Sequence, residues 1–135
     1  MRLRNLALSG LLAIAASSST FGALPYGPDT CRQGYVWREA FPGDHVCVTP
    51  ATRTDAAAAN RDAAARRQPG GGAYGPDTCR QGYVWREASP NDHVCVTPAT
   101  RTRTASDNRE AASRRERDTG GVPIDGGTAL VPADN

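Results

Sequence analysis

The sequence has no lysine and few aromatic residues, which make up 6% of its 135 positions. Beyond residue 23, leucine and isoleucine are nearly absent as well. A short chain so poor in large apolar side chains cannot bury enough surface to fold unaided, so we expect covalent cross-links to hold it together. The missing lysines accompany abundant Ala, Arg and Asp, and we attribute them to the coding bias of a GC-rich genome rather than to function.

An excess of charge of one sign is also lacking once the N-terminal segment is set aside. The chain carries 16 basic and 14 acidic residues, and two of the basic ones are Arg2 and Arg4. Sixteen minus two leaves fourteen basic residues against fourteen acidic ones. The small positive charge of the full chain therefore gives no support to a nucleic-acid or membrane-surface partner.

Residues 1–23 have the three-part pattern of a secretory signal. Arg2 and Arg4 precede an apolar run over residues 6–16, and small residues follow. This run is too short to span a bilayer of roughly 30 Å as a helix, and no second hydrophobic run follows it. We predict a secreted protein without a membrane span and, because no Cys lies beside the signal, without an N-terminal lipid. The candidate cleavage points are Ser18, Gly22 and Ala23.

The most informative feature is an internal repeat. Residues 26–67 return as 74–115, and 34 of these 42 positions are identical, the first fifteen (YGPDTCRQGYVWREA) without exception. The differences fall at 41–44 against 89–92 and in the second half of each copy. We divide the chain into the signal at 1–23, unit 1 at 24–68, a Gly-rich linker at 69–73, unit 2 at 74–118, and a tail at 119–135 with the composition of a flexible segment.

Each unit is predicted to begin with a β-hairpin. Residues 35–40 and 45–49 are rich in aromatic and β-branched side chains and flank Pro42-Gly43, which is Pro90-Asn91 in the second copy. Gly and Asn most easily take a positive φ, so we expect a tight turn with Pro at its second position. The register then places Tyr35, Trp37, Val46 and Val48 on one face of the hairpin and Arg38, His45 and Cys47 on the other.

A helix is predicted to follow each hairpin. Thr49-Pro50 is a helix start, and the next seventeen residues are dominated by Ala, Arg and Asp. Pro69 with the glycines at 70–72, and the glycines at 120–121, should end the two helices. A face containing Ala57, Asn60, Arg61 and Ala64 is identical in both copies and should lie on the hairpin. The predicted fold is α+β: two small disulfide-stapled units in tandem, each a β-hairpin followed by one Ala-rich α-helix.

Four cysteines in an exported chain indicate disulfides, because export delivers them to an oxidising compartment. Cys31 and Cys47 lie sixteen residues apart, as do Cys79 and Cys95, and only this pairing makes each unit self-contained. Each bond would contribute roughly 3 kcal/mol to the stability of the fold.

The alternative to the disulfides is a zinc site formed by two Cys and His45, or His93 in unit 2. It lacks a fourth ligand and the short spacing of paired zinc cysteines, so we predict no metal and no other cofactor.

Aromatic residues are the candidate ligand contacts, because flat rings stack well at low entropic cost. They are Tyr26, Tyr35 and Trp37 in unit 1 and Tyr74, Tyr83 and Trp85 in unit 2. In a unit with so few large apolar groups, the tryptophan is better placed in the core, and we expect Trp37 to be buried against the helix. Tyr26 and Tyr74 lie outside the hairpin and are the better candidates for exposed contact.

Other polar clusters have weaker functional interpretations. Asp44, His45 and Glu39 bring acids and a base together, as general acid-base catalysis requires. No Ser or Cys nucleophile lies nearby, and a chain of this size has too few residues to enclose a pocket that excludes water. We therefore predict that the protein is not an enzyme.

The Arg pairs at 66–67 and 114–115 could bind an anionic polymer. They also stabilise the C-terminal ends of helices, and nearby acidic residues cancel their positive field, so we expect them to be solvated.

The string GPDTCxxGYVWREAxPxDHVCVTP, followed by a helix containing Asn-Arg and Ala-Ala, resembles a repeat of secreted or cell-surface proteins of GC-rich bacteria, for which we know no activity. The resemblance covers both units. It implies export and modularity, and it implies no catalytic residues.

Together these features predict a secreted, monomeric, non-enzymatic tandem module that binds an extracellular glycan, such as wall polysaccharide, or another protein. Two weak sites on a short linker would act together through their effective concentration. One alternative is a disulfide-rich inhibitor or effector of an extracellular enzyme, with loops 26–29 and 41–44 exposed. The other is a small hydrolase that uses Asp44, His45 and Glu39 at a concave site.

Overall fold

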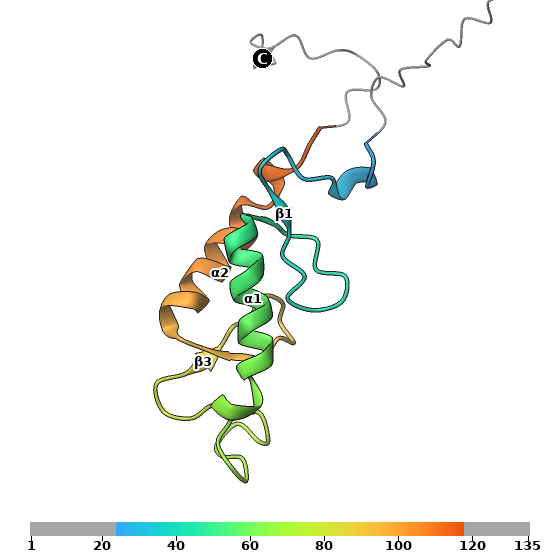
Figure 1. Ribbon diagram of the computed structural model, residues 1–135. Helices are drawn as coiled ribbons and strands as arrows, with labels where there is room; N and C mark the ends of the chain where they lie inside the picture. Colours follow the sequence, from blue (N-terminus) through green and yellow to red (C-terminus); the bar gives the residue numbers. More distant parts are fainter. Residues whose placement is uncertain (1–23, 118–135) are drawn as a thin grey trace, which may run out of the picture.

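A computed structural model describes residues 24–117 of the chain (Figure 1). Unit 1 contains η1 (Gly27–Asp29), β1 (Val36–Trp37), β2 (Cys47–Val48), α1 (Pro50–Asp62) and η2 (Ala64–Arg66). Unit 2 contains β3 (Val84–Trp85), β4 (Cys95–Val96), α2 (Pro98–Glu110) and η3 (Ala112–Arg114). The predicted α+β fold, a hairpin followed by a helix in each of two tandem units, is confirmed. The predicted signal at 1–23, the tail at 119–135 and the glycines at 120–121 lie outside the described residues.

The helices begin where the sequence predicts. Thr49 is extended, its Oγ1 accepts a hydrogen bond from the amide of Thr52 (3.3 Å), and Pro50 occupies the first turn of α1. Thr97 and Pro98 repeat this arrangement in α2. No helix within residues 24–117 is both long and apolar enough to cross a membrane.

The expected end of the first helix at Pro69 is wrong. α1 ends at Asp62 and tightens into the 3-10 turn η2, after which Arg67 forms a β-bridge with Cys79. The chain leaves the helix early because the residues after it pair with unit 2. α2 likewise ends at Glu110 and is followed by η3.

The hairpin turn forms at the predicted residues, but the register differs from the prediction by one. The amide of Asp44 donates to the carbonyl oxygen of Phe41 (3.1 Å), and Gly43 has a φ of 86°. The ladder pairs Trp37 with Cys47, where an uninterrupted two-residue hairpin would pair it with Val48. The extra residue is accommodated at Glu39, whose φ of 51° is typical of a β-bulge.

This bulge changes which side chains share a face of the hairpin. Paired residues of an antiparallel ladder lie on the same face, so Trp37 lies on the side of Cys47. The predicted grouping of Trp37 with Val46 and Val48, and of Arg38 with Cys47, is therefore wrong.

The buried face of the helix also differs from the prediction. Ala56 and Ala59 of α1 are buried, as are their counterparts Thr104 and Asp107 in α2. The side chains expected on the hairpin are exposed, although the Asn60 side chain still donates to the hairpin carbonyl of Ala40 (2.9 Å). These exposed residues are Ala57, Asn60, Arg61 and Ala64.

Both predicted disulfides are present. Cys31 is bonded to Cys47 and Cys79 to Cys95, with Cα atoms 5.6 and 5.7 Å apart. Each bond ties the segment after the first turn of a unit to the second strand of its hairpin. The zinc alternative required free thiolates, and no cysteine is free.

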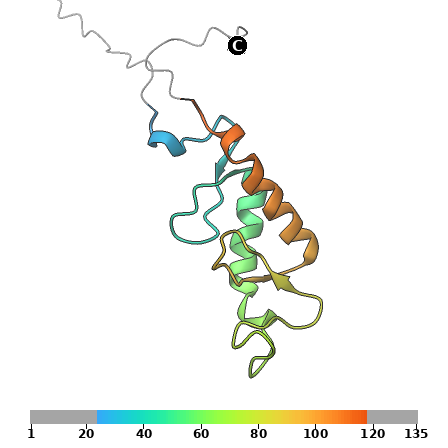
Figure 2. The ribbon, with the colours of Figure 1, turned by 180° about the vertical axis from the view of Figure 1, so that it is seen from behind.

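The two units form one closed body with approximate two-fold symmetry. The tail of unit 1 pairs with the head of unit 2 through Arg67 and Cys79, and the tail of unit 2 pairs with the head of unit 1 through Arg115 and Cys31. The end of the described chain thus returns to its beginning, and in Figures 1 and 2 the blue and orange segments lie together. Each unit therefore holds the other at two places.

The centre of this body contains two buried ion pairs beside small apolar residues. Arg38 and Asp44 form an ion pair (2.7 Å) in which each side chain is only 2% exposed, and Arg86 and Asp92 form the equivalent pair (2.6 Å). Each arginine also donates across the boundary between the units, Arg38 to the carbonyl of Ala88 (3.4 Å) and Arg86 to that of Ala40 (3.3 Å). Ala40, Ala56 and Ala88 form an apolar cluster with Phe41 packed against it, and Val48 and Val96 are also buried.

Candidate functional site

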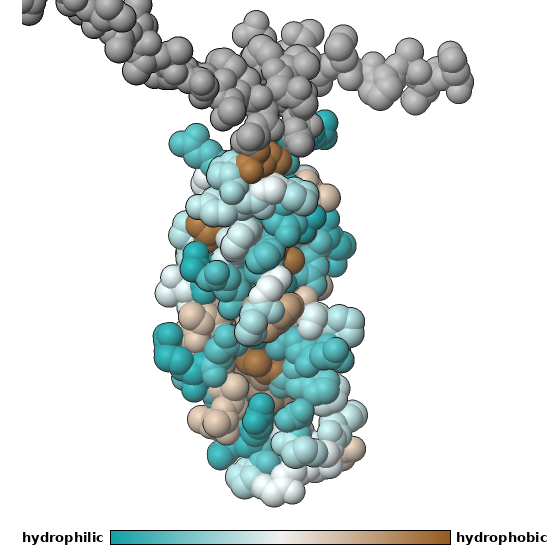
Figure 3. All heavy atoms as spheres, turned by 90° about the vertical axis from the view of Figure 1, so that its right-hand side faces the viewer, coloured by the Kyte–Doolittle hydropathy of each residue, from teal (hydrophilic) through white to brown (hydrophobic). Residues whose placement is uncertain are grey.

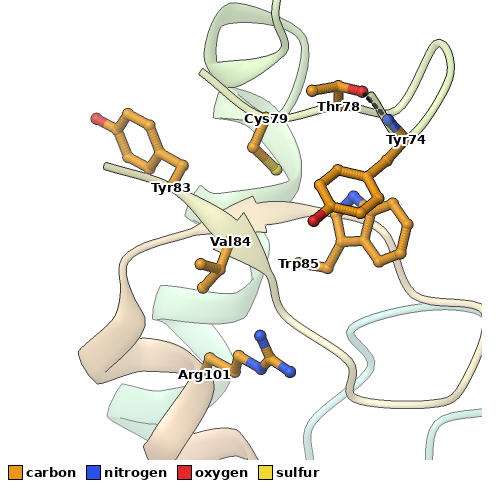
Figure 4. A pocket seen from close by; sticks show the side chains of 7 residues that line it. All are labelled: Tyr74, Thr78, Cys79, Tyr83, Val84, Trp85 and Arg101. Carbon is orange, nitrogen blue, oxygen red and sulfur yellow. Dashed lines mark hydrogen bonds between the residues drawn. The ribbon is translucent and has the colours of Figure 1, made fainter. Parts of the chain in front are cut away.

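The six aromatic residues predicted to contact a ligand gather in two equivalent surface hollows. The first aromatic hollow has a volume of about 390 Å³ and the second about 300 Å³. The first is lined by Tyr26, Tyr35 and Trp37, and the second by Tyr74, Tyr83 and Trp85 (Figure 4). The equivalent pairs Thr30 and Thr78, Cys31 and Cys79, Val36 and Val84, and Arg53 and Arg101 also line them.

Trp37 is only partly buried, so the expectation that it packs into the core against the helix is wrong. Its indole stacks on the ring of His45, with centroids 3.9 Å apart, and its Nε1 donates to the carbonyl of Asp29 (2.8 Å). The bulge at Glu39 places the indole on the same face of the hairpin as Cys47. Trp85 repeats these contacts with His93 (3.8 Å) and Asp77 (2.8 Å).

Tyr26 and Tyr74 are exposed, as predicted. Their relative exposures are 66% and 73%, and they are the exposed large hydrophobic residues of the described chain. The ring of Tyr26 meets Trp37 edge-on at 5.3 Å, and that of Tyr74 meets Trp85 at 5.6 Å. Figure 4 shows the Tyr74 and Trp85 rings forming one wall, with the amide of Tyr74 donating to Thr78 Oγ1 (2.9 Å). Each hollow therefore presents an aromatic wall to solvent.

Tyr35 and Tyr83 are each covered by an arginine from the other unit. The guanidinium of Arg114 lies over Tyr35, 5.1 Å from the ring centroid, and that of Arg66 lies over Tyr83 at 4.9 Å. Figure 4 shows Tyr83 on the opposite side of Val84 from the Tyr74–Trp85 wall. Each of these tyrosine rings is thus contacted by the neighbouring unit, although the residues that line each hollow come from one unit.

The arginine pairs at the helix ends contact the other unit rather than solvent alone. Arg66 donates to the carbonyl of Cys95 (3.4 Å) and Arg114 to that of Cys47 (3.2 Å). Burial lowers the pKa of Arg114. The hydrogen bonds and negative charges of Asp107 and Glu110 together raise this pKa by more than burial lowers it, so the net pKa of Arg114 lies above its usual value. Arg114 therefore stays charged, and sequence reasoning had missed its structural role.

The candidate acid-base residues do not form one constellation. Asp44 is buried in its ion pair with Arg38, and His45 Nδ1 bonds to Asp29 Oδ2 (3.0 Å). Glu39 pairs with Arg53 at the rim of the first aromatic hollow. Glu39 and His45 line a separate shallow hollow of about 300 Å³, which Asp44 does not line.

Residues 24–117 contain no group of three or more His, Cys, Asp or Glu side chains placed to hold a metal ion.

The sequence differences between the copies avoid the aromatic hollows. Subtracting 34 identities from 42 leaves eight differing positions, and none of them lines either hollow. Five of them, at 55, 56, 58, 59 and 62, lie on one side of α1. Four of these five line the hollow between α1 and unit 2. The copies thus differ mainly where they meet.

No protein-family model matches the chain, and neither a curated protein nor a solved structure shows a significant match to it.

Proposed function

We propose that the protein is a secreted, non-enzymatic binding module with two equivalent sites for an extracellular saccharide, one in each aromatic hollow. The observation that carries this proposal is the gathering of three aromatic side chains in each hollow, with the same lining in both units. Open hollows of this volume with an apolar floor and a few polar groups are typical of small-ligand sites.

The chemistry of the lining favours a neutral saccharide. A sugar ring has an apolar C–H face that packs on aromatic rings and a rim of hydroxyl groups that need hydrogen-bond partners. Tyr26 and Trp37 supply the rings, and the Arg53–Glu39 pair supplies donors and acceptors at the rim. Arg53 and Glu39 also cancel each other's charge, so neither an anionic nor a cationic ligand is favoured.

Secretion is supported by three independent features. Residues 1–23 have the pattern of an export signal, both cysteine pairs are in disulfides, and the repeat resembles one of exported bacterial proteins. An oxidising extracellular environment keeps these disulfides, and wall glycans are present there.

The remaining candidate functions have less support. As an inhibitor the protein would present loops 26–29 and 41–44, but Phe41 packs on the central alanines and Asp44 is buried, which leaves Tyr26 as the large exposed hydrophobic side chain of the two loops. As a hydrolase it would need Asp44 beside His45 and Glu39, and Asp44 is engaged by Arg38.

The proposal is tested by binding of chitohexaose, cellohexaose and maltohexaose, measured by calorimetry and by tryptophan fluorescence. We expect at least one to bind the full mature chain and the double variant Tyr26→Ala/Tyr74→Ala to lose that binding. Arg61→Ala, an exposed helix position outside both hollows, is the matched control. Equal binding by the double variant, or capture of a secreted protein with no glycan bound, would overturn the saccharide site.

A further inference from the structure

The two aromatic hollows lie at opposite ends of the body. β1 forms the floor of the first and β3 the floor of the second. In Figures 1 and 2, β1 with the blue segment before it lies at one end of the paired helices, and β3 with the yellow-green segment before it lies toward the other. A short ligand held in one hollow therefore does not reach the other.

The surface between the hollows offers no continuous aromatic track. Tyr26 and Tyr74 are the exposed large hydrophobic residues within 24–117, and each belongs to its own hollow. The helices between carry charged pairs such as Arg103 with Asp55 (3.1 Å). Figure 3 shows small separate apolar patches among hydrophilic residues on the face it presents. A single sugar strand would thus lose its stacking partners between the two sites.

The hollows are also held apart by the fold. Reciprocal backbone hydrogen bonds join the units at both ends, from Arg80 to the Arg66 carbonyl and from Arg32 to the Arg114 carbonyl, each 2.8 Å long. The linker itself is folded, because Gly72 and Gly75 exchange hydrogen bonds of 3.1 and 3.0 Å. The sequence suggested two weak sites on a short linker that act together through their effective concentration, but a closed body cannot bring its two ends together.

We infer that the protein bridges glycans: each aromatic hollow holds a separate strand, and one chain cross-links two strands. This inference rests on the proposed saccharide sites. It also gives the duplication a purpose, because one unit with one hollow binds a strand without joining it to another.

The test is agglutination of latex beads coated with chitohexaose, with cellohexaose and maltohexaose beads in parallel. Wild-type full-length mature protein should agglutinate the beads that it binds. The single variants Tyr26→Ala and Tyr74→Ala should bind one oligosaccharide per chain instead of two and should fail to agglutinate. Arg61→Ala should behave as wild type. Circular dichroism melts confirm that each variant is folded, and Trp37→Phe and Trp85→Phe provide a second pair of single-site variants.

The outcomes separate the inference from the function on which it rests. Agglutination by a single-site variant, which a self-associating protein would give, overturns bridging and leaves saccharide binding intact. Binding of two oligosaccharides without agglutination does the same. Failure of wild type to bind any of the three glycans overturns the proposed function and the inference together.

Discussion

Asp55 and Arg103 occupy the same position in the two copies of the repeat, and their side chains meet across the boundary between the units, with Arg103 Nη2 3.1 Å from Asp55 Oδ2. Near an approximate two-fold axis, a residue faces its own counterpart. Two identical charges there would repel, whereas the Asp and Arg attract. Phe41 and Ser89 also occupy equivalent positions and differ, and both line the hollow between the units. At these two positions the copies have diverged.

We predict that the ion pair of Asp55 and Arg103 stabilises the packing of the two units against each other. Asp55→Arg and Arg103→Asp should each destabilise the protein by about 0.5–1 kcal/mol, because each places like charges face to face at a partly exposed site. The doubly exchanged variant should recover wild-type stability. Urea unfolding at low salt measures all four proteins, and additive single effects with no recovery would mean that the charges do not interact.

A second prediction concerns the isolated unit. The disulfide pairing predicts self-contained units, but in the structure the Cys31 segment, the Cys47 carbonyl and the Tyr35 ring of unit 1 are held by the tail of unit 2. Residues 24–68, expressed alone and oxidised, should therefore lack a cooperative melt as a monomer. Adding the separately expressed residues 69–117 should restore it.

Circular dichroism and light scattering after gel filtration follow this reconstitution. The matched control is the full mature chain cleaved within the linker, which should stay associated. A monomeric unit 1 that melts like the full chain would show that the contacts between the units are dispensable.

A third prediction concerns the buried ion pair of Arg38 and Asp44. The Asp44 carboxylate also accepts hydrogen bonds from the amides of Ala40 (3.1 Å) and Val46 (3.4 Å). Asp44→Ala should cost about 3–5 kcal/mol, because it leaves the arginine buried without a counter-charge. Asp55→Ala, at an exposed pair, should cost at most about 1 kcal/mol. Similar urea midpoints for the two variants would contradict the polar core.

The sequence predicted the elements and the disulfides well, because those depend on local signals. Thr49-Pro50 and Pro42-Gly43 each act over a few residues, the cysteines pair within one unit, and each feature is found as expected. The register of the hairpin could not be predicted from local signals. It requires a positive φ at Glu39, which is unusual for a non-glycine residue. This conformation depends on the buried ion pair of Arg38 and Asp44, around which the turn folds.

The aromatic residues of the candidate site were predicted from the sequence, but the contacts that hold them in place were not. Tyr26 and Trp37 were chosen for their chemistry, and they do lie together. The arginines that cover Tyr35 and Tyr83 come from the other unit, and nothing in a single copy reveals a partner in the next. The one available signal was the pattern of differences at 55–62, which marks the boundary between the units only once the helices are seen to meet.

A fourth prediction concerns the disulfides in a closed body. Mass spectrometry of a non-reduced digest should find Cys31 joined to Cys47 and Cys79 to Cys95. Cys31→Ser/Cys47→Ser should lower stability by roughly 3 kcal/mol by the loop-entropy estimate. Because each unit holds the other, the whole protein should still unfold in one transition. Two separate transitions in calorimetry would show units that fold independently.

The last prediction distinguishes the structural from the binding role of Trp37. Its indole makes one hydrogen bond to a backbone carbonyl, worth about 1 kcal/mol. It also stacks on His45 and meets Tyr26 edge-on, and each of these ring contacts is worth about 0.5 kcal/mol. Trp37→Ala should thus cost roughly 2 kcal/mol and keep a cooperative melt, whereas a fully buried tryptophan would cost about 3–5 kcal/mol.

Trp37→Ala also allows the second aromatic hollow to be measured by itself. The chain has two tryptophans, so all tryptophan fluorescence of this variant comes from Trp85. Acrylamide should quench Trp85 to an intermediate degree, as its partial exposure requires. A saccharide bound in the second aromatic hollow should reduce this quenching, and Tyr74→Ala in the same background should remove the protection. If Trp37→Ala abolishes the melt and Trp85 resists acrylamide without ligand, the indoles are core residues, and the aromatic hollows lose their binding walls.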